Sequence, residues 1–158
     1  MQITLITVGG LKESYLREAC GEYRARLTPL CSFEEINLKE ERIADETDPS
    51  AVAAALEHEG GQILSRVPKG CPLVALCVEG RELSSEEFAE TVGRFGDGAG
   101  KVCFAIGSSH GLSPAVKAKA DLKLSYSKMT LPHQLMRVFF LESIYRALSI
   151  LRGNKYHK

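Results

Sequence analysis

The chain has 158 residues, of which 44% are hydrophobic, and its formal net charge at pH 7 is zero. At this length a single domain buries roughly two thirds of the surface that its unfolded chain exposes, so no disulfide framework or structural metal is needed. The five cysteines include no Cys-x-x-Cys pair, which favours reduced core thiols. Residues 3–8 form an apolar run too short to span a membrane, without the flanks of a secretion signal. We therefore expect one cytoplasmic domain over residues 1–158, with no membrane partner.

The charge is distributed unevenly along the chain. Residues 1–114 carry 11 Lys and Arg against 18 Asp and Glu, whereas residues 115–158 carry 9 against 2. A basic C-terminal part could attract a polyanion such as RNA while the rest of the surface stays acidic. The alternative is that the basic part pairs internally with acidic elements.

Segments with strand and helix patterns alternate along the chain. Strands are expected at residues 3–8, 33–38, 73–78, 102–106 and 122–124, and helices at 14–27, 51–67, from 84 onward, after 113–114 and at 132–151. The acidic segment 39–49 is expected to be a solvated loop with no chemical role. Gly60-Gly61 predicts a break or kink in the second helix, because each glycine costs about 1 kcal/mol relative to alanine. This alternation predicts an α/β fold, a parallel sheet flanked by helices, with ligands bound beyond the carboxyl ends of the strands.

Two loops that follow predicted strands are candidates for one ligand pocket. The first is residues 107–111, and the second is residues 124–132, which ends at a proline suited to the first position of a helix. Loops fixed at both ends can offer backbone N–H and C=O groups to a ligand. His133, on the first turn of the last helix, is the candidate to orient a substrate or to move a proton, although an ordinary role at the helix end is equally compatible.

The first loop also matches the G-x-S-x-G pattern of a hydrolase nucleophile elbow, with Ser109 at its centre. A triad in a known chain order can be written as Ser109, Asp121 and His133. Only one short strand and one long helix follow the motif, however, and Asp121 begins that strand, so the hydrolase is disfavoured. The chain has no Walker loop, no G-x-G-x-x-G and no H-E-x-x-H motif.

The last helix and the tail suggest partners. Apolar residues around Glu142 exceed what one buried face needs, which predicts a dimer interface. The tail combines cations with an aromatic ring, a combination typical of RNA contacts, although a frayed terminus has the same composition. The candidate RNA contacts are Arg137, Arg146, Arg152, Lys155, Tyr156, His157 and Lys158.

Five groups of residues carry a resemblance to a known family. They are Ile3-Thr-Leu-Ile-Thr-Val-Gly9 with Leu11-Lys12, Phe104-Ala-Ile-Gly107 with Gly111-Leu-Ser113, Leu124 to His133, Arg137 with Glu142 and Tyr145-Arg-Ala147, and Tyr156-His-Lys158. Over the whole chain they resemble the large-subunit (23S) rRNA pseudouridine N3-methyltransferase H family, of the SPOUT or α/β-knot class. One departure is Ser108, where the family usually has a second glycine.

The resemblance implies a sheet whose C-terminal part forms a trefoil knot, a homodimer, and S-adenosyl-L-methionine bound in the knot. The implied cofactor contacts are Leu76, Gly107, Tyr126, Ser127, Lys128, Met129, Thr130 and Leu131. The implied reaction is methylation of N3 of a pseudouridine in a loop of large-subunit ribosomal RNA, on free RNA or the assembled ribosome, without a metal. A serine hydrolase built on Ser109 and a noncatalytic dimeric RNA-binding module are the alternatives.

Overall fold

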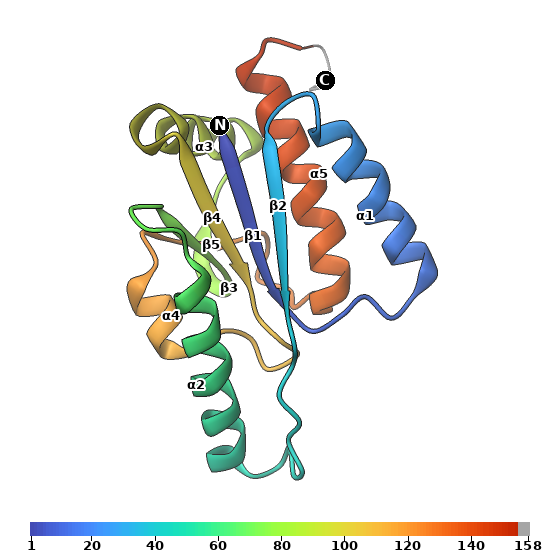
Figure 1. Cartoon of the computed structure of the whole chain (residues 1–158), viewed down its shortest axis with the longest axis vertical. Helices are drawn as coiled ribbons and strands as arrows, with labels where there is room; N and C mark the ends of the chain where they lie inside the picture. The colour runs from blue at the N-terminus through green and yellow to red at the C-terminus, as the bar shows by residue number, and fades with distance from the viewer. Residues whose placement is uncertain (155–158) are drawn as a thin grey trace.

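The computed structural model describes residues 1–154, along which strands and helices alternate from β1 to α5 (Figure 1). The strands are β1 (Gln2–Val8), β2 (Ser32–Leu38), β3 (Leu73–Glu82), β4 (Lys101–Ile106) and β5 (Leu122–Ser125). The helices are α1 (Ser14–Leu27), α2 (Pro49–Arg66), α3 (Ser85–Ala99), α4 (Pro114–Lys119) and α5 (His133–Leu151). The predicted alternation and the α/β fold class are confirmed.

All five strands run parallel in one sheet, in the order β2-β1-β4-β3-β5. Helices α1, α3 and α5 pack on one face, and α2 and α4 pack on the other (Figure 1). The central strands β1 and β4 are buried over almost their whole length, which explains why they read as continuous apolar runs instead of alternating ones.

Alternate residues of β4 supply the two halves of the core. Phe104 and Ile106 face α3 and α5, whereas Cys103 and Ala105 face α2 and α4. The phenyl ring of Phe104 lies 4.8 Å from that of Phe140 on α5, between ring centroids, in a tilted arrangement favoured by aromatic quadrupoles. The larger side chains on this face therefore fix α5 against the centre of the sheet.

Helix α2 is unbroken through Gly60-Gly61, so the predicted break is wrong. A β-carbon on Gly60 would collide with the Oγ and Cβ atoms of Ser113, whereas one on Gly61 would meet nothing within 4 Å. Ser113 is the N-cap of α4, where its hydroxyl accepts a hydrogen bond from Val116 N. The close packing of α2 on this cap offsets the low helix propensity of Gly60, and that packing cannot be seen from local sequence.

Strand β3 is longer than predicted and bends at its end. It leaves β4 after Leu76 and continues along β5 with a register shift between Leu76 and Arg81. A β-carbon on Gly80 would lie 2.7 Å from the backbone nitrogens of Leu124 and Ser125, so this close crossing requires glycine. The bend separates residues 77–79 from the neighbouring strand and opens space at the carboxyl edge of the sheet.

The paired glycines of α2 provide a direct test of this packing. We expect Gly61→Ala to raise the free energy of unfolding by about 0.5–1 kcal/mol, because alanine favours the helix and the site is open. Gly60→Ala should lower it by about 1–3 kcal/mol, because α2 must move away from Ser113. Urea unfolding followed by circular dichroism measures both changes; equal effects of the two substitutions would contradict the assigned packing.

Candidate functional site

A cavity of about 630 Å³ lies at the carboxyl ends of β3, β4 and β5, and we call it the strand-end cavity. Its apolar lining includes Leu76, Ile106 and Leu124, one residue from each of the three strands. Its walls come mainly from residues 107–112, 125–127 and 129–133. The two loops expected to share one pocket therefore do so, because parallel strands bring their carboxyl ends to the same edge.

The cofactor contacts implied by the resemblance gather at this cavity, with one exception. Those that line it are Leu76, Gly107, Tyr126, Ser127, Met129, Thr130 and Leu131. Lys128 is exposed and is not part of the lining.

The first loop, 107–111, is a tight turn in which the backbone atoms of two glycines pack directly against one another. A β-carbon on Gly107 would collide with the carbonyl group of Gly111, and Gly111 N donates to Ser108 O over 2.9 Å. Gly111 itself has a φ of +87°, a conformation that L side chains rarely adopt. Both glycines are thus required by geometry, and the turn presents main-chain atoms to the cavity.

Ser108, the departure from the family pattern, is buried and bonded to α2. Its hydroxyl donates to Glu59 Oε2 over 2.8 Å, while Glu59 Oε1 accepts from Glu41 N over 2.9 Å. One buried carboxylate thus connects the turn after β4 with the loop after β2. The Ser108 side chain has its own partner and does not disturb the turn.

The second loop is held by its own hydroxyl groups. Ser125 Oγ donates to Ser127 O over 2.9 Å, and Ser127 Oγ accepts from Met129 N over 3.0 Å. The ring of Tyr126 packs edge-on against Phe139 and Phe88, with centroid distances of 4.7 and 6.4 Å. Burial raises the pKa of Tyr126, so its phenol stays neutral. Its hydroxyl oxygen has no hydrogen-bond partner among the described residues.

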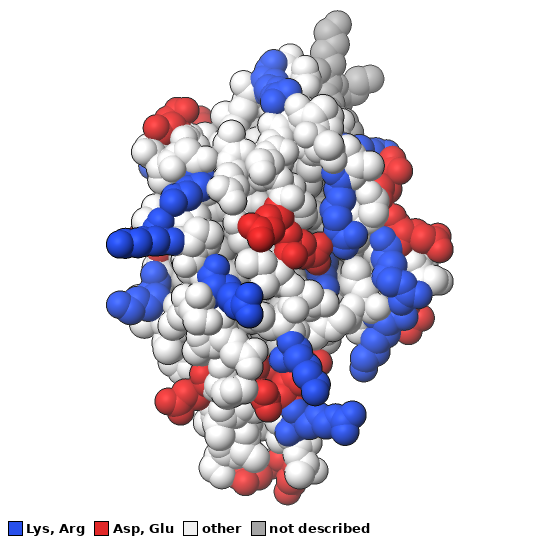
Figure 2. All heavy atoms as spheres, in the orientation of Figure 1, with Lys and Arg blue, Asp and Glu red and all other residues white. Residues whose placement is uncertain are grey.

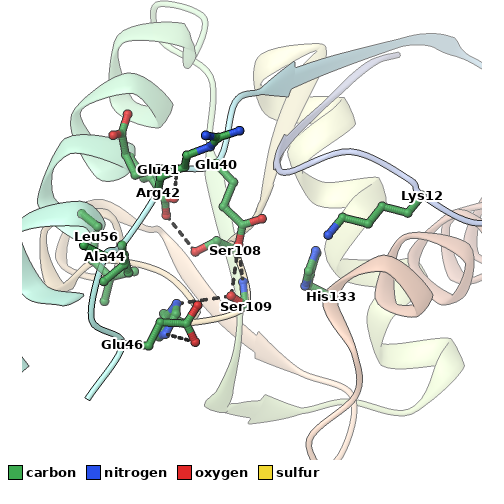
Figure 3. A pocket seen from close by; sticks show the side chains of 14 residues that line it. Lys12, Glu40, Glu41, Arg42, Ala44, Glu46, Leu56, Ser108, Ser109 and His133 are labelled. Atoms are coloured by element: carbon green, nitrogen blue, oxygen red, sulfur yellow. Dashed lines mark hydrogen bonds and ion pairs between the residues drawn. The ribbon is translucent and has the colours of Figure 1, made fainter. Parts of the chain in front are cut away.

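A second cavity, of about 730 Å³, adjoins the first, and we call it the outer cavity (Figure 3). The two cavities share four lining residues, Ser108, Ser109, His110 and His133. The outer cavity is completed by Lys12, by residues 40–44 and 46, and by α2. A position between the two cavities is therefore open to both a cofactor and a second reactant.

The loop after β2 takes part in the lining of this site, so segment 39–49 is not only the solvated loop that was expected. Glu40 Oε1 accepts hydrogen bonds from Ser109 N over 3.3 Å and from Ser109 Oγ over 3.0 Å. Sequence reasoning missed Glu40 because an acidic run looks like solvated surface. The available signal was its position, since it follows the carboxyl end of a strand that pairs with β1.

His133 lies at the boundary of the two cavities, with the Lys12 side chain directed toward it (Figure 3). Desolvation lowers the pKa of His133 below its usual value, an effect that Glu40 opposes and that Arg137 and Lys12 reinforce. The imidazole is therefore neutral at neutral pH and can accept a proton. This arrangement fits the predicted role of His133.

The hydrolase triad is not assembled. Asp121 Oδ2 accepts from Leu73 N over 2.8 Å, at the amino end of β3, which is the edge of the sheet opposite Ser109. Ser109 Oγ lies 3.2 Å from His110 Nδ1, but His110 Nε2 is 3.9 Å from Glu46, too far for the hydrogen bond that orients a catalytic histidine. The G-x-S-x-G match reflects the glycine turn after β4.

The described RNA-contact candidates are engaged within the chain. Arg137 is only 2% exposed, donates to Gly9 O and lies 3.6 Å from Glu35, so its side chain is not available to RNA and that expectation is contradicted. Arg146 forms a 2.6 Å ion pair with Glu142, and Arg152 donates to the carbonyl oxygens of Pro29 and Leu30. The remaining candidates, Lys155, Tyr156, His157 and Lys158, lie outside the described residues.

The two charge classes are interspersed over the face in Figure 2, and they do not separate into an acidic and a basic half. Part of the C-terminal positive charge is paired with the N-terminal acidic part, as in the 2.5 Å contact between Lys117 and Glu79 at the strand-end cavity. This ion pair lowers the pKa of Glu79. Within residues 1–154, no helix is long and apolar enough to cross a membrane, and no group of three potential metal ligands is found.

Comparison with known proteins identifies the family. The sequence profile described as "Predicted SPOUT methyltransferase" matches residues 1–157. A protein of Caldicellulosiruptor bescii named "Ribosomal RNA large subunit methyltransferase H" is 47% identical over 156 residues, covering 99% of both chains. The protein of that name from Bacillus pumilus is 43% identical over 159 residues, covering 100% of both.

A solved structure agrees in fold. The crystal structure of TrmJ from Z. mobilis matches with a TM-score of 0.53 at 15% identity, covering 92% of this chain and 69% of that one. A likeness at this identity concerns the arrangement of strands and helices alone, and it agrees with the parallel sheet and its flanking helices. From the profile match and the full-length relatives, the chain belongs to the ribosomal RNA large subunit methyltransferase H family of SPOUT methyltransferases.

Proposed function

We propose that this protein transfers the methyl group of S-adenosyl-L-methionine to N3 of a pseudouridine in a loop of large-subunit ribosomal RNA. The strand-end cavity is the observation that carries the proposal, because the residues implied to hold the cofactor line it, apart from Lys128. Full-length relatives named for large-subunit ribosomal RNA methylation support the substrate class.

The residues present fit the cofactor. An adenine ring needs an apolar slot with backbone partners nearby, and Leu76, Ile106 and Leu124 supply the apolar surface. The collision that a β-carbon on Gly107 would make with Gly111 means that main chain packs against main chain where the first turn closes. Thr130 also lines the cavity, and no backbone hydrogen bond of Thr130 is found in the described part of the chain, so its N–H and C=O groups are available to a ligand.

When bound, the cofactor supplies a methyl group already activated by its sulfonium sulfur, so the protein mainly has to position the target base and remove its N3 proton. His133 is our candidate proton acceptor, because its ring faces both cavities and its lowered pKa keeps it unprotonated at neutral pH. The outer cavity is the approach for the base, which must leave the stack of its neighbours to enter it.

We infer that the active form is a homodimer built on the exposed apolar face near the start of α5. Leu135 and Phe139, one helical turn apart, are 43% and 44% exposed, and Met129 of the second loop is 76% exposed. Large apolar side chains gathered at the surface favour burial against another chain. The resemblance also supports a trefoil knot in the C-terminal part and a cytoplasmic location, and we include both in the proposal.

Cofactor binding can be tested with a matched pair of glycine substitutions. Titration calorimetry should give micromolar affinity of the wild type for S-adenosyl-L-methionine. Gly107→Ala should weaken it about five- to hundredfold, because relieving the collision with Gly111 costs about 1–3 kcal/mol. Gly98→Ala, at an open position of α3, should leave the affinity unchanged. Absence of wild-type binding up to millimolar concentration would contradict the proposed function.

The dimer proposal predicts that charge on the exposed face of α5 dissociates the protein. Sedimentation velocity at micromolar concentration should show a dimer for the wild type and a monomer for Phe139→Glu. Ala54→Glu, on the exposed side of α2 across the sheet, is the control and should stay dimeric. A wild-type monomer under these conditions would remove the dimer, and with it any site built from two chains.

The tail prediction rests on sequence alone. Deleting residues 155–158 removes two lysines, a tyrosine and a histidine, groups that contact phosphates and stack on bases for about 1–3 kcal/mol per stacked base. We expect methylation of ribosomal RNA to slow strongly, whereas cofactor affinity and dimerisation change little. Full-rate methylation by the truncated protein would show that the tail has no role in RNA binding; loss of cofactor binding would assign the tail to the pocket instead.

A further inference from the structure

The outer cavity contains a carboxylate that faces His133. Glu40 Oε1 is occupied by the two hydrogen bonds from Ser109, which leaves Oε2 directed toward the backbone of Gly9. A β-carbon built on Gly9 would lie 3.1 Å from Glu40 Oε2 and 3.5 Å from His133 Nε2. Among the described residues no hydrogen bond or ion pair joins the carboxylate to the imidazole, so Glu40 acts on His133 through space, across a glycine that has no side chain to separate them.

Gly9 is fixed in this role by two further observations. Its φ of +84° is a conformation that favours glycine, and its carbonyl oxygen accepts a hydrogen bond from the buried guanidinium of Arg137. The end of β1 is thereby held against α5, and the Glu40 carboxylate is held on the other side by its two hydrogen bonds from Ser109.

The other charged groups near His133 come from each element around it. Lys12 approaches from the loop after β1, Arg137 from the next turn of α5, and His110 from the turn after β4. Glu59 lies behind Ser108, where its two oxygens already accept hydrogen bonds. Glu40 is thus the carboxylate that favours a protonated His133, against two cations that oppose it.

We propose that Glu40 is a positioning residue that acts on proton transfer through His133: its charge stabilises the imidazolium formed when His133 takes the N3 proton of a uracil-type base. This inference rests on the proposed function and assigns the base to the outer cavity. Glu40 does not line the strand-end cavity, so its role is separate from cofactor binding.

The step balances without another reactant. His133 Nε2 accepts the proton as the N3–H bond breaks, and the electron pair left on N3 forms the new bond to the methyl carbon. The carbon–sulfur bond breaks toward sulfur, which becomes a neutral thioether. The imidazolium beside Glu40 later releases its proton to water. Glu40 acts only while His133 is charged, so it lowers the energy of the transition state more than that of the resting enzyme.

The test is the pH dependence of single-turnover methylation of pseudouridine-containing ribosomal RNA by the full-length protein. Glu40→Gln keeps an amide oxygen that can accept from Ser109 N, so it removes charge with little change of shape. The acid limb of the variant's pH–rate profile should move to lower pH, because loss of the carboxylate lowers the pKa of His133. The plateau rate should fall roughly tenfold, less than the 10²–10⁴ expected on losing a general base. The affinity for S-adenosyl-L-methionine should be unchanged.

Two further variants isolate the mechanism. Glu57→Gln removes an exposed carboxylate of α2 and should reproduce the wild-type profile. In a His133→Gln background, Glu40→Gln should add no further loss, since both changes act on one proton transfer.

The inference would be overturned if the acid limb of the pH–rate profile did not shift in Glu40→Gln, or if Glu40→Gln lowered the rate by the same factor with and without His133. In either case, methylation by the wild type would still support the proposed function. A wild-type enzyme that does not methylate the RNA would overturn both.

Discussion

Close approach of one backbone to another, at positions where only glycine fits, is the constraint on which the site depends. Gly107 allows the turn after β4 to close on Gly111, and Gly80 allows the end of β3 to cross the end of β5. Each contact leaves main chain where a side chain would otherwise stand. The strand-end cavity exists because these turns are narrow enough to stay out of it, and a single methyl group at either glycine would force the loops to move.

A buried ionic contact gives this scaffold its second fixed point. Arg137 is almost completely buried, donates to Gly9 O and lies 3.6 Å from Glu35 of β2. Burial lowers the pKa of Arg137, and Glu35 opposes that effect, so the guanidinium stays charged. Removing Glu35 would leave the buried guanidinium of Arg137 without a carboxylate partner, which costs about 3–5 kcal/mol, whereas Glu35 would keep its 2.9 Å ion pair with Arg24 if Arg137 were removed. Helix α5, β1 and β2 are therefore joined close to the loop that carries Glu40 and to the first turn of α5, which carries His133.

Local patterns in the sequence were sufficient for much of the fold. The apolar runs at 102–106 and 73–78 identified β4 and the first part of β3, and the helix expected from residue 84 onward begins with Ser84 and Glu87 in a capping box. Alternation of strands and helices then implied a parallel sheet, and this topology brought the two loops to one cavity. These inferences succeed because each depends on neighbours in sequence or on a general rule of topology.

The features that were missed depend on contacts between distant segments. An arginine on an amphipathic helix looks exposed, and only its packing on Gly9 and Glu35 reveals that Arg137 is internal. Glu40 belongs to an acidic run, and its proximity to Ser109, 69 residues away, follows from the order of strands in the sheet. Gly60 looks like a helix breaker until Ser113 is placed beside it. Secondary-structure propensity depends on a residue and its neighbours in sequence, and the partners of Arg137, Glu40 and Gly60 all lie far away along the chain.

The link from Glu41 through Glu59 to Ser108 has a consequence for how the sequence can vary. Glycine at position 108 would remove a hydroxyl that donates to a buried carboxylate, and a hydrogen bond to a charged group contributes about 1.5–3 kcal/mol. Glycine at position 108 leaves the stability unchanged only in a chain where residue 59 is no longer a carboxylate, or where its carboxylate accepts a hydrogen bond from another donor. Positions 59 and 108 should therefore change together over evolutionary time, and grafting either residue alone into a homologue should carry a penalty that the pair avoids.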